Sequence, residues 1–282
     1  MPISARIRLV TSTALVAMVL TGCSMSGAPG PDPTPAAGGS TSPIGPAPST
    51  PSASVSADDE GSSAASRQSP SPNPSESTTE QTERSREAAG TALLRATRAD
   101  DLAGVRRAIE DGADVETRSS AERTPLVIAT RANRVAIARA LLEAGADPDA
   151  KDSIEDSAFL YAGAEGLNRI LKLTLAHGAD VRSINRYGGT ALIPASEHAH
   201  LRTIRILIDA GVPVNHVNNL GWTALHEAIV LGAGSDRYVT AVGMLLDAGA
   251  DPSIPDRNGV LPRKLAADRG FTDIVAEIDR HR

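Results

Sequence analysis

The strongest constraint on the fold of this chain is a triplet that returns at a fixed interval. Gly-Ala-Asp occurs four times, and the degenerate Gly211-Val212-Pro213 fills the gap in the series. The intact copies begin at Gly112, Gly145, Gly178 and Gly249. Successive positions in this series are 33, 33, 33 and 38 residues apart. A period of this length is typical of a solenoid built from small supersecondary units.

A second marker keeps the same rhythm. It is carried by Thr91, Thr124, Ser157, Thr190, Thr223 and, after 38 residues, Leu261. Two markers in phase, with apolar residues at three- and four-residue steps between them, predict a turn and two short helices per unit. We therefore predict an all-α solenoid over residues 86–282, with about six helix-turn-helix units beginning near these six residues and with β-turn or hairpin tips.

The residues that carry this rhythm resemble the ankyrin repeat. Thr223-Ala224-Leu225-His226-Glu227-Ala228 matches the opening of its consensus, and Leu141-Leu142-Glu143-Ala144-Gly145-Ala146-Asp147 matches its close. The resemblance covers about residues 88–282 and is to bacterial members, including exported ones. Glu122 and Glu155 stand where a turn glycine is usual, so we expect less regular turns there. Because stacked units supply the core of such an array, we expect Leu142 to be buried between neighbours.

The amino terminus has the pattern of a lipoprotein signal peptide over residues 1–22. Arg6 and Arg8 precede a twelve-residue apolar stretch that is too short to span a bilayer as a mature helix. Leu20-Thr21-Gly22-Cys23 then looks like a bacterial lipobox, and Cys23 is the only cysteine of the chain. We predict lipidation of Cys23 and an exported protein anchored to a bacterial membrane or envelope. The alternative is a plain secretory signal in which Cys23 is incidental.

Residues 23–85 have the composition of a disordered tether. Eleven of the 19 prolines lie between Ser24 and Glu80, interleaved with serine, threonine, glycine and alanine. Such a segment buries too little apolar surface to offset the entropy lost on ordering. We predict a flexible spacer between the anchor and the repeats.

Charge and motifs exclude several functions. The formal net charge is −6, and no basic face of the kind that binds nucleic acid is evident. We find no nucleophile motif or phosphate-binding loop, so we predict no enzyme, no cofactor and no small-molecule substrate. Glu197, His198 and His200 remain an alternative metal site or enzyme site. Two side chains that are two residues apart on a helix, however, point in nearly opposite directions and would hold a metal ion poorly. The resemblance instead gives His200 a place at the interhelical turn and makes His226 a capping residue.

The resemblance implies that partners meet the turn tips and the inner face of the first helix of each unit. The tip positions are Arg186, Tyr187, Leu220 and Trp222. The inner-helix positions are Tyr161, Glu197, His198 and Glu227. Tyrosine, tryptophan and arginine dominate interface hot spots, which predicts a non-enzymatic scaffold that binds a protein partner. Two alternatives stay open: Tyr187 and Trp222 brace adjacent turns, or the whole array is a passive envelope spacer.

The unit beginning at Thr223 is five residues longer than the others. The extra length lies near Gly232–Arg237, between the two predicted helices. We interpret it as a tolerated surface loop, because lengthening a loop costs little entropy. A private contact made by this loop is the alternative.

Overall fold

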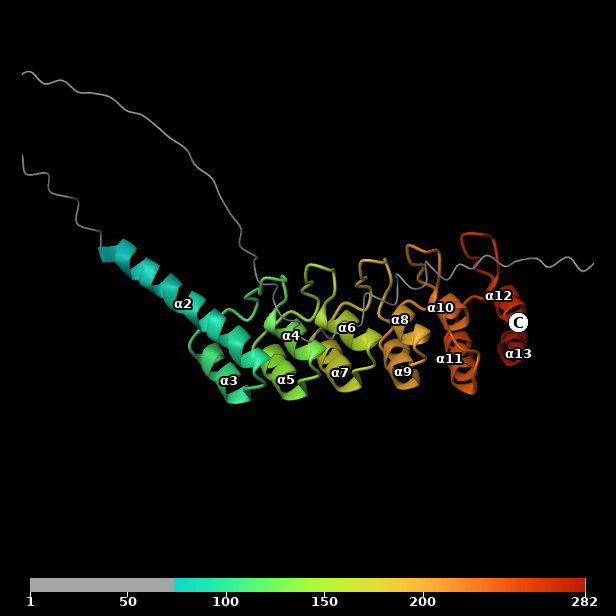
Figure 1. Ribbon diagram of the computed structural model, residues 1–282, viewed down its shortest axis with the longest axis horizontal. Helices are drawn as coiled ribbons and strands as arrows, with labels where there is room; N and C mark the ends of the chain where they lie inside the picture. The colour runs from blue at the N-terminus through green and yellow to red at the C-terminus, as the bar shows by residue number, and fades with distance from the viewer. Residues whose placement is uncertain (1–73, 282) are drawn as a thin grey trace, which may run out of the picture. The chain divides into compact units, whose positions relative to one another are not determined.

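The computed structural model of the protein describes residues 74–281, which contain helices and turns but no strand. Twelve helices follow one another in two parallel layers (Figure 1). They are α2 (Pro74–Arg98), α3 (Leu102–Glu110), α4 (Pro125–Arg131), α5 (Val135–Glu143), α6 (Ala158–Ala164), α7 (Asn168–Ala176), α8 (Leu192–Glu197), α9 (Leu201–Asp209), α10 (Ala224–Val230), α11 (Asp236–Asp247), α12 (Pro262–Asp268) and α13 (Thr272–Arg280).

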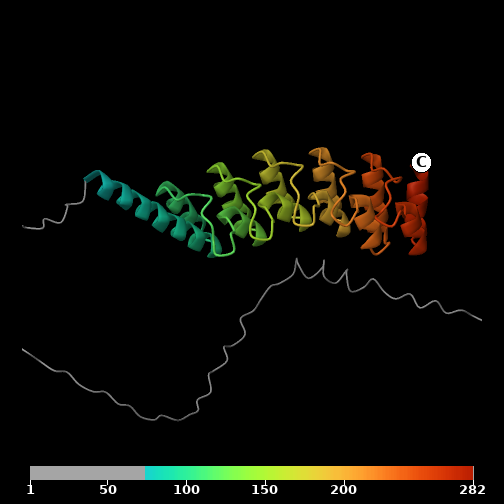
Figure 2. The same ribbon diagram turned by 90° about the horizontal axis from the view of Figure 1, so that it is seen from above.

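The helices form six pairs that stack side by side. The first helix of each pair packs on the first helices of its neighbours, and the second helices do the same in a parallel layer. The connecting loops all project from one edge of the stack, and the same order is visible from above (Figures 1 and 2). The predicted all-α solenoid of six units is confirmed.

The core is a continuous band of small and aliphatic side chains. In the second unit, Ile137, Ala138 and Leu141 of α5 are fully or almost fully buried, and Leu142 is 2% exposed. Gly145 follows with φ of 92°, the left-handed conformation that ends a helix at low cost when no side chain is present. The expected burial of Leu142 is therefore confirmed.

The phase markers act as helix caps in half of the units. The side-chain oxygens of Thr124, Ser157 and Thr223 accept hydrogen bonds from the third backbone N–H that follows each, at 3.2, 3.2 and 3.5 Å. These bonds satisfy donors that a helix start otherwise leaves unpaired. Thr190 makes no such bond, and Leu261 has no side-chain oxygen that could accept one.

The first unit differs from the prediction. Helix α2 has 25 residues and begins at Pro74, so residues 74–85 of the predicted tether are helical. Thr91 lies inside this helix and does not begin it. Glutamate, glutamine and arginine favour a helix across residues 74–85, and proline is well tolerated at the first position of a helix. The predicted signal peptide, Cys23 and the tether up to residue 73 lie outside the described residues. None of the helices among residues 74–281 has the length and apolar character to cross a membrane.

The tips are regular five-residue turns. They span 119–123, 152–156, 185–189, 218–222 and 256–260, and each is closed by two backbone hydrogen bonds. Glu122 and Glu155 adopt φ of 55° and 60°, close to the 69° of Gly188 at the same position. Their N–H groups make the same turn bond, at 2.9 Å in both cases. The expectation of less regular turns was wrong, because the closing bonds hold a glutamate in the left-handed region despite its steric cost.

An aspartate or asparagine side chain stabilises the backbone of four of these tips. Asp152, Asn185, Asn218 and Asp256 occupy the first tip position. In each, Oδ1 accepts hydrogen bonds from the backbone N–H groups two and four residues later, at 2.8–3.1 Å. Such bonds mimic a backbone turn and make the tip conformation local to the sequence. The spacing of 33, 33 and 38 residues is in phase with the other markers and could have revealed them.

The insertion in the fifth unit is not only a loop. Helix α11 has 12 residues where the other second helices have nine, so part of the extra length is helical. Tyr238 donates from its hydroxyl to the Glu197 carbonyl at 2.9 Å, and Arg237 Nε donates to the Ala199 carbonyl at 2.7 Å. The inserted residues therefore fasten the fifth unit to the fourth.

Candidate functional site: the tips and the inner helices

The tips are joined to one another by hydrogen bonds that repeat along the stack. Lys151 Nζ donates to the Ile184 carbonyl at 2.7 Å, and the Asn219 N–H donates to the Tyr187 carbonyl at 2.9 Å. Arg118 makes the equivalent bond to the Lys151 carbonyl. The Asn219–Tyr187 bond joins two tips directly, and the other two bonds join the residues just before the tips, so neighbouring tips are held in register. A surface ordered in advance loses little entropy when a partner binds.

Two arginine–tyrosine stacks lie on this edge of the solenoid. The Arg131 guanidinium carbon lies 4.5 Å from the ring centre of Tyr161, and that of Arg186 lies 4.6 Å from the ring centre of Tyr187. Both arginines also face one carboxylate, since each Nη1 is 3.7 Å from Asp156 Oδ2. The predicted residues Tyr161, Arg186 and Tyr187 therefore meet in one cluster, which we call the Arg–Tyr cluster.

Sequence reasoning missed Arg131 and Asp156, which complete the Arg–Tyr cluster. Burial raises the pKa of the Asp156 carboxyl, and the neighbouring Arg186 opposes that rise. Arg186 also donates to the Ile154 carbonyl at 3.3 Å, so it braces the preceding tip as well as covering Tyr187. This bracing contact is made by Arg186, for which the sequence did not predict it. Tyr161 and Tyr187 are nevertheless only half-buried, so each keeps part of its surface exposed to solvent.

A second cluster consists of two carboxylates on neighbouring first helices. Glu227 of α10 is 4% exposed, and its Oε1 accepts from Asn218 Nδ2 at 3.0 Å. Its Oε2 is buried with no hydrogen-bond partner among the described residues. Burial, followed by the nearby Glu197 charge, raises the pKa of Glu227 to about 8. Burial also raises the pKa of Glu197. Glu227 is therefore largely protonated at neutral pH, and is less accessible than predicted for a contact residue.

Leu220 and Trp222 share the tip 218–222. Both are half-buried, and their backbone N–H groups donate to Asn218 Oδ1 at 2.9 and 3.0 Å. His198 is exposed at the end of α8. The eight predicted contact residues thus lie in three places along the edge: the Arg–Tyr cluster, the carboxylate pair with His198, and the Trp222 tip.

The histidines have structural roles. His226 is fully buried, and its Nδ1 accepts from the Thr223 N–H at 3.2 Å, which confirms the predicted capping role. Burial lowers its pKa. The rings of His198 and His200 are 5.5 Å apart and inclined by 51°. Burial lowers the pKa of His200, with His198 and Arg237 adding to the effect. Within residues 74–281, no group of three or more His, Cys, Asp and Glu side chains could hold a metal ion.

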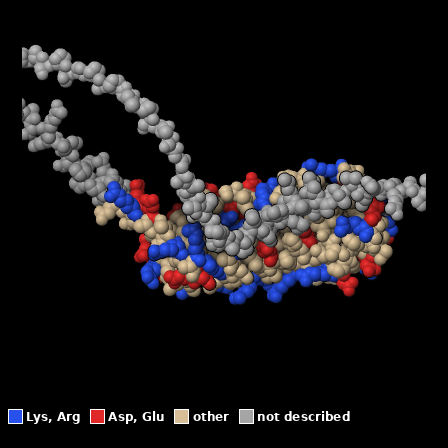
Figure 3. All heavy atoms as spheres, in the orientation of Figure 1, with Lys and Arg blue, Asp and Glu red and all other residues tan. Residues whose placement is uncertain are grey.

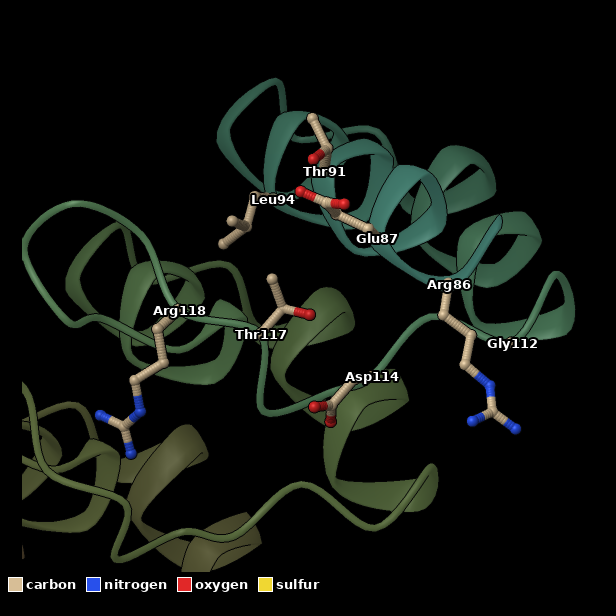
Figure 4. A pocket seen from close by; sticks show the side chains of 8 residues that line it. All are labelled: Arg86, Glu87, Thr91, Leu94, Gly112, Asp114, Thr117 and Arg118. Atoms are coloured by element: carbon tan, nitrogen blue, oxygen red, sulfur yellow. The ribbon is translucent and has the colours of Figure 1, made fainter. Parts of the chain in front are cut away.

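An open cleft of about 730 Å³ lies between α2 and the loop that follows α3. Arg86, Glu87, Thr91 and Leu94 of α2 face Thr117 and its neighbours in the loop (Figure 4). Acidic and basic side chains both line this cleft, so its charge does not favour an anionic or a cationic ligand. Basic and acidic residues are likewise interspersed over the visible face of the molecule (Figure 3).

Comparison with known proteins identifies the repeats. The model of the family described as ankyrin repeats (3 copies) matches residues 74–152 and 159–256, more than half of the chain. The chain belongs to the ankyrin repeat family. Ankyrin repeats mediate the binding of protein partners, and members of the family are typically non-enzymatic interaction domains.

Solved ankyrin structures share the fold. An ankyrin repeat domain from Acinetobacter baumannii AYE is 49% identical with a TM-score of 0.66, and the match covers 67% of this chain and 96% of that one. The ankyrin repeat protein EF0377 is 37% identical with a TM-score of 0.67, over 68% of this chain and 98% of that one. The ankyrin repeat domain of Bcl-3 is 25% identical with a TM-score of 0.62, over 67% and 85% of the two chains.

A curated relative matches over a short segment. The putative ankyrin repeat protein YahD of Escherichia coli (strain K12) is 43% identical over 51 residues. That segment is 18% of this chain and spans a quarter of the relative.

Proposed function

We propose that this ankyrin repeat protein is a non-enzymatic scaffold that binds a protein partner along its tips and inner helices. The observation that carries the proposal is the row of tips held in register by hydrogen bonds, with half-buried aromatic rings on it. Large, rigid aromatic side chains bury much area while they lose few rotamers, which favours them as binding anchors. The partner would contact the Arg–Tyr cluster and the Trp222 tip together.

The partner proposal is tested by crosslinking in cells followed by affinity capture. We expect Tyr187→Ala/Trp222→Ala to reduce captured partner at least tenfold, because truncation of a hot-spot residue costs about 2 kcal/mol or more. Lys172→Ala/Arg205→Ala, on the exposed surface of the second helices, is the matched control and should capture the partner normally. The same captured proteins from all three chains would instead favour the passive spacer.

We further propose that the protein is exported and anchored to a bacterial membrane by lipid on Cys23. The support is the basic start, the apolar stretch and Leu20-Thr21-Gly22-Cys23 in the sequence. Several acyl chains at one cysteine would anchor stably, since each buried methylene contributes about 0.8 kcal/mol. Residues 24–73 would then act as the spacer that carries the repeats away from the membrane.

The anchor is tested by metabolic labelling with an acyl-chain analogue. We expect the native chain to be labelled and recovered with membranes, and Cys23→Ser to lose both properties. Ser24→Ala, next to the modified position, serves as the control. Label retained by Cys23→Ser would contradict lipidation at this residue.

A further inference from the structure

A second cleft, of about 390 Å³, lies where the first unit meets the second. It is bounded by the end of α2, by the tip 119–123 and by α4. Three arginines line it, Arg98, Arg123 and Arg131, together with Ser119 and Ser120. Its remaining lining is apolar and includes Ile128. No carboxylate of the described residues lines this cleft, although acidic residues outnumber basic ones in the chain.

Two of the three arginines are held in place by the tip 152–156 and by α6. Arg123 Nε lies 3.2 Å from Asp152 Oδ2, and Arg131 contacts Asp156 and the Tyr161 ring as described above. Both carboxylate oxygens of Asp152 have partners within the protein, since its other oxygen accepts hydrogen bonds from two backbone N–H groups of its own tip. Guanidinium groups fixed in this way lose little freedom when they bind an anion.

The side chains that line the cleft have more hydrogen-bond donors than the protein itself pairs. Arg98 forms no ion pair with any residue in the described part of the chain, and Arg123 bonds Asp152 through Nε alone. Ser119 Oγ accepts from the Arg123 N–H at 3.2 Å, which leaves the hydroxyl proton to donate. Several N–H and O–H donors therefore surround one open space. The planar fork of arginine matches the two oxygens of a carboxylate.

We propose that this cleft binds a carboxylate side chain from an acidic segment of the partner protein. The apolar lining at Ile128 would contact the methylenes of a glutamate or the apolar neighbours of an aspartate. The cleft has room for one such side chain and part of its backbone. The nature of the occupant rests on the proposed scaffold function, whereas the affinity for carboxylate does not.

The test is an NMR titration of the full chain labelled with ¹⁵N-arginine, in which the Nε–Hε signals are followed. The probe is the capped peptide Gly-Glu-Leu-Glu-Gly, and its glutamine analogue is the neutral control. We expect the signals of Arg98, Arg123 and Arg131 to shift and saturate with the glutamate peptide only. Arg139 and Arg205, exposed on second helices, should not move.

Variants complete the test. Arg98→Gln and Arg131→Gln should each weaken the peptide about tenfold, because a charge-assisted hydrogen bond is lost. Arg205→Gln should bind normally, and unchanged backbone signals will show that each variant is folded. The proposal is overturned by equal shifts at Arg205, by equal response to the glutamine peptide, or by tighter binding of inorganic phosphate.

The two proposals fail separately. A partner captured through Tyr187 and Trp222, beside an unresponsive cleft, would overturn the carboxylate site and leave the scaffold standing. Saturating shifts at the three arginines, with no partner captured, would support the site and count against the scaffold.

Discussion

Leu142→Ala is expected to lower the free energy of unfolding by about 2–5 kcal/mol. Leu142 is 2% exposed and lies on α5, which packs between α3 and α7. Truncation removes apolar area from the core and leaves a cavity that thin, closely stacked layers cannot readily close. Because each unit is stabilised by its neighbours, the loss weakens two interfaces at once.

Urea unfolding followed by circular dichroism measures this effect. Trp222→Ala is the comparison, because Trp222 is half-buried at a tip and outside the core. We expect it to lower stability far less than Leu142→Ala. An equal loss for both variants would assign Trp222 to the structure and remove it from the proposed contact surface.

Glu227→Gln is expected to remove a pH dependence of stability. The pKa of Glu227 is raised from 4.5 to about 8, chiefly by burial and then by Glu197. Between these two values the folded protein holds a proton that the unfolded chain releases. Stability from this group is therefore complete at low pH and declines as pH rises from about 4.5 to about 8. The decline is on the order of 3–5 kcal/mol, at about 1.4 kcal/mol per pKa unit.

The variant should lose the part of this decline that Glu227 causes and keep the part that the raised pKa of Glu197 causes. It should be more stable than the native chain at pH 8.5. Glutamine keeps the oxygen that Asn218 donates to and carries no charge to desolvate. Glu143→Gln, at an exposed position on α5, is the control and should retain the native pH profile. A native-like decline in Glu227→Gln would show that Glu227 does not titrate in this range.

Features that depend on near neighbours in the chain were predictable. The 33-residue period correctly predicted six helix pairs. The helix ends are set by local contacts, namely the caps at Thr124, Ser157 and Thr223 and the glycines after the second helices, which bond or bend the backbone within a few residues. The role of His226 followed for the same reason. The side chains of Asp152 and its counterparts act on their tips equally locally, and their regular spacing in the sequence is sufficient to predict them.

The helical extension of the first unit was not predicted, because its composition was read together with the proline-rich segment before it. Residues 75–89 lack proline and glycine and are rich in helix-forming residues. The part of α2 from Ala89 onward is buried in places and packs on α3 and α4, whereas residues 81–88 are exposed, so packing stabilises the extension only through its continuity with that part. Gly90 lies against Thr117, where a Cβ would come within 2.6 Å of its hydroxyl oxygen. That close approach depends on how the first tip folds back.

The repeat period, the helix caps and the turn residues can be predicted from the sequence, because each acts through a few neighbouring backbone groups. These three features were enough to predict the family and the stacked helix pairs. The meeting of Arg131 of α4 with Asp156 and Arg186 of two successive tips, and the burial of Glu227 beside Glu197, depended on the stacking of the units. Charge pairing and desolvation act through space, so residues 25–55 positions apart come to share one environment only when the units stack. The candidate contact surfaces therefore belong to the assembled solenoid and to no single repeat.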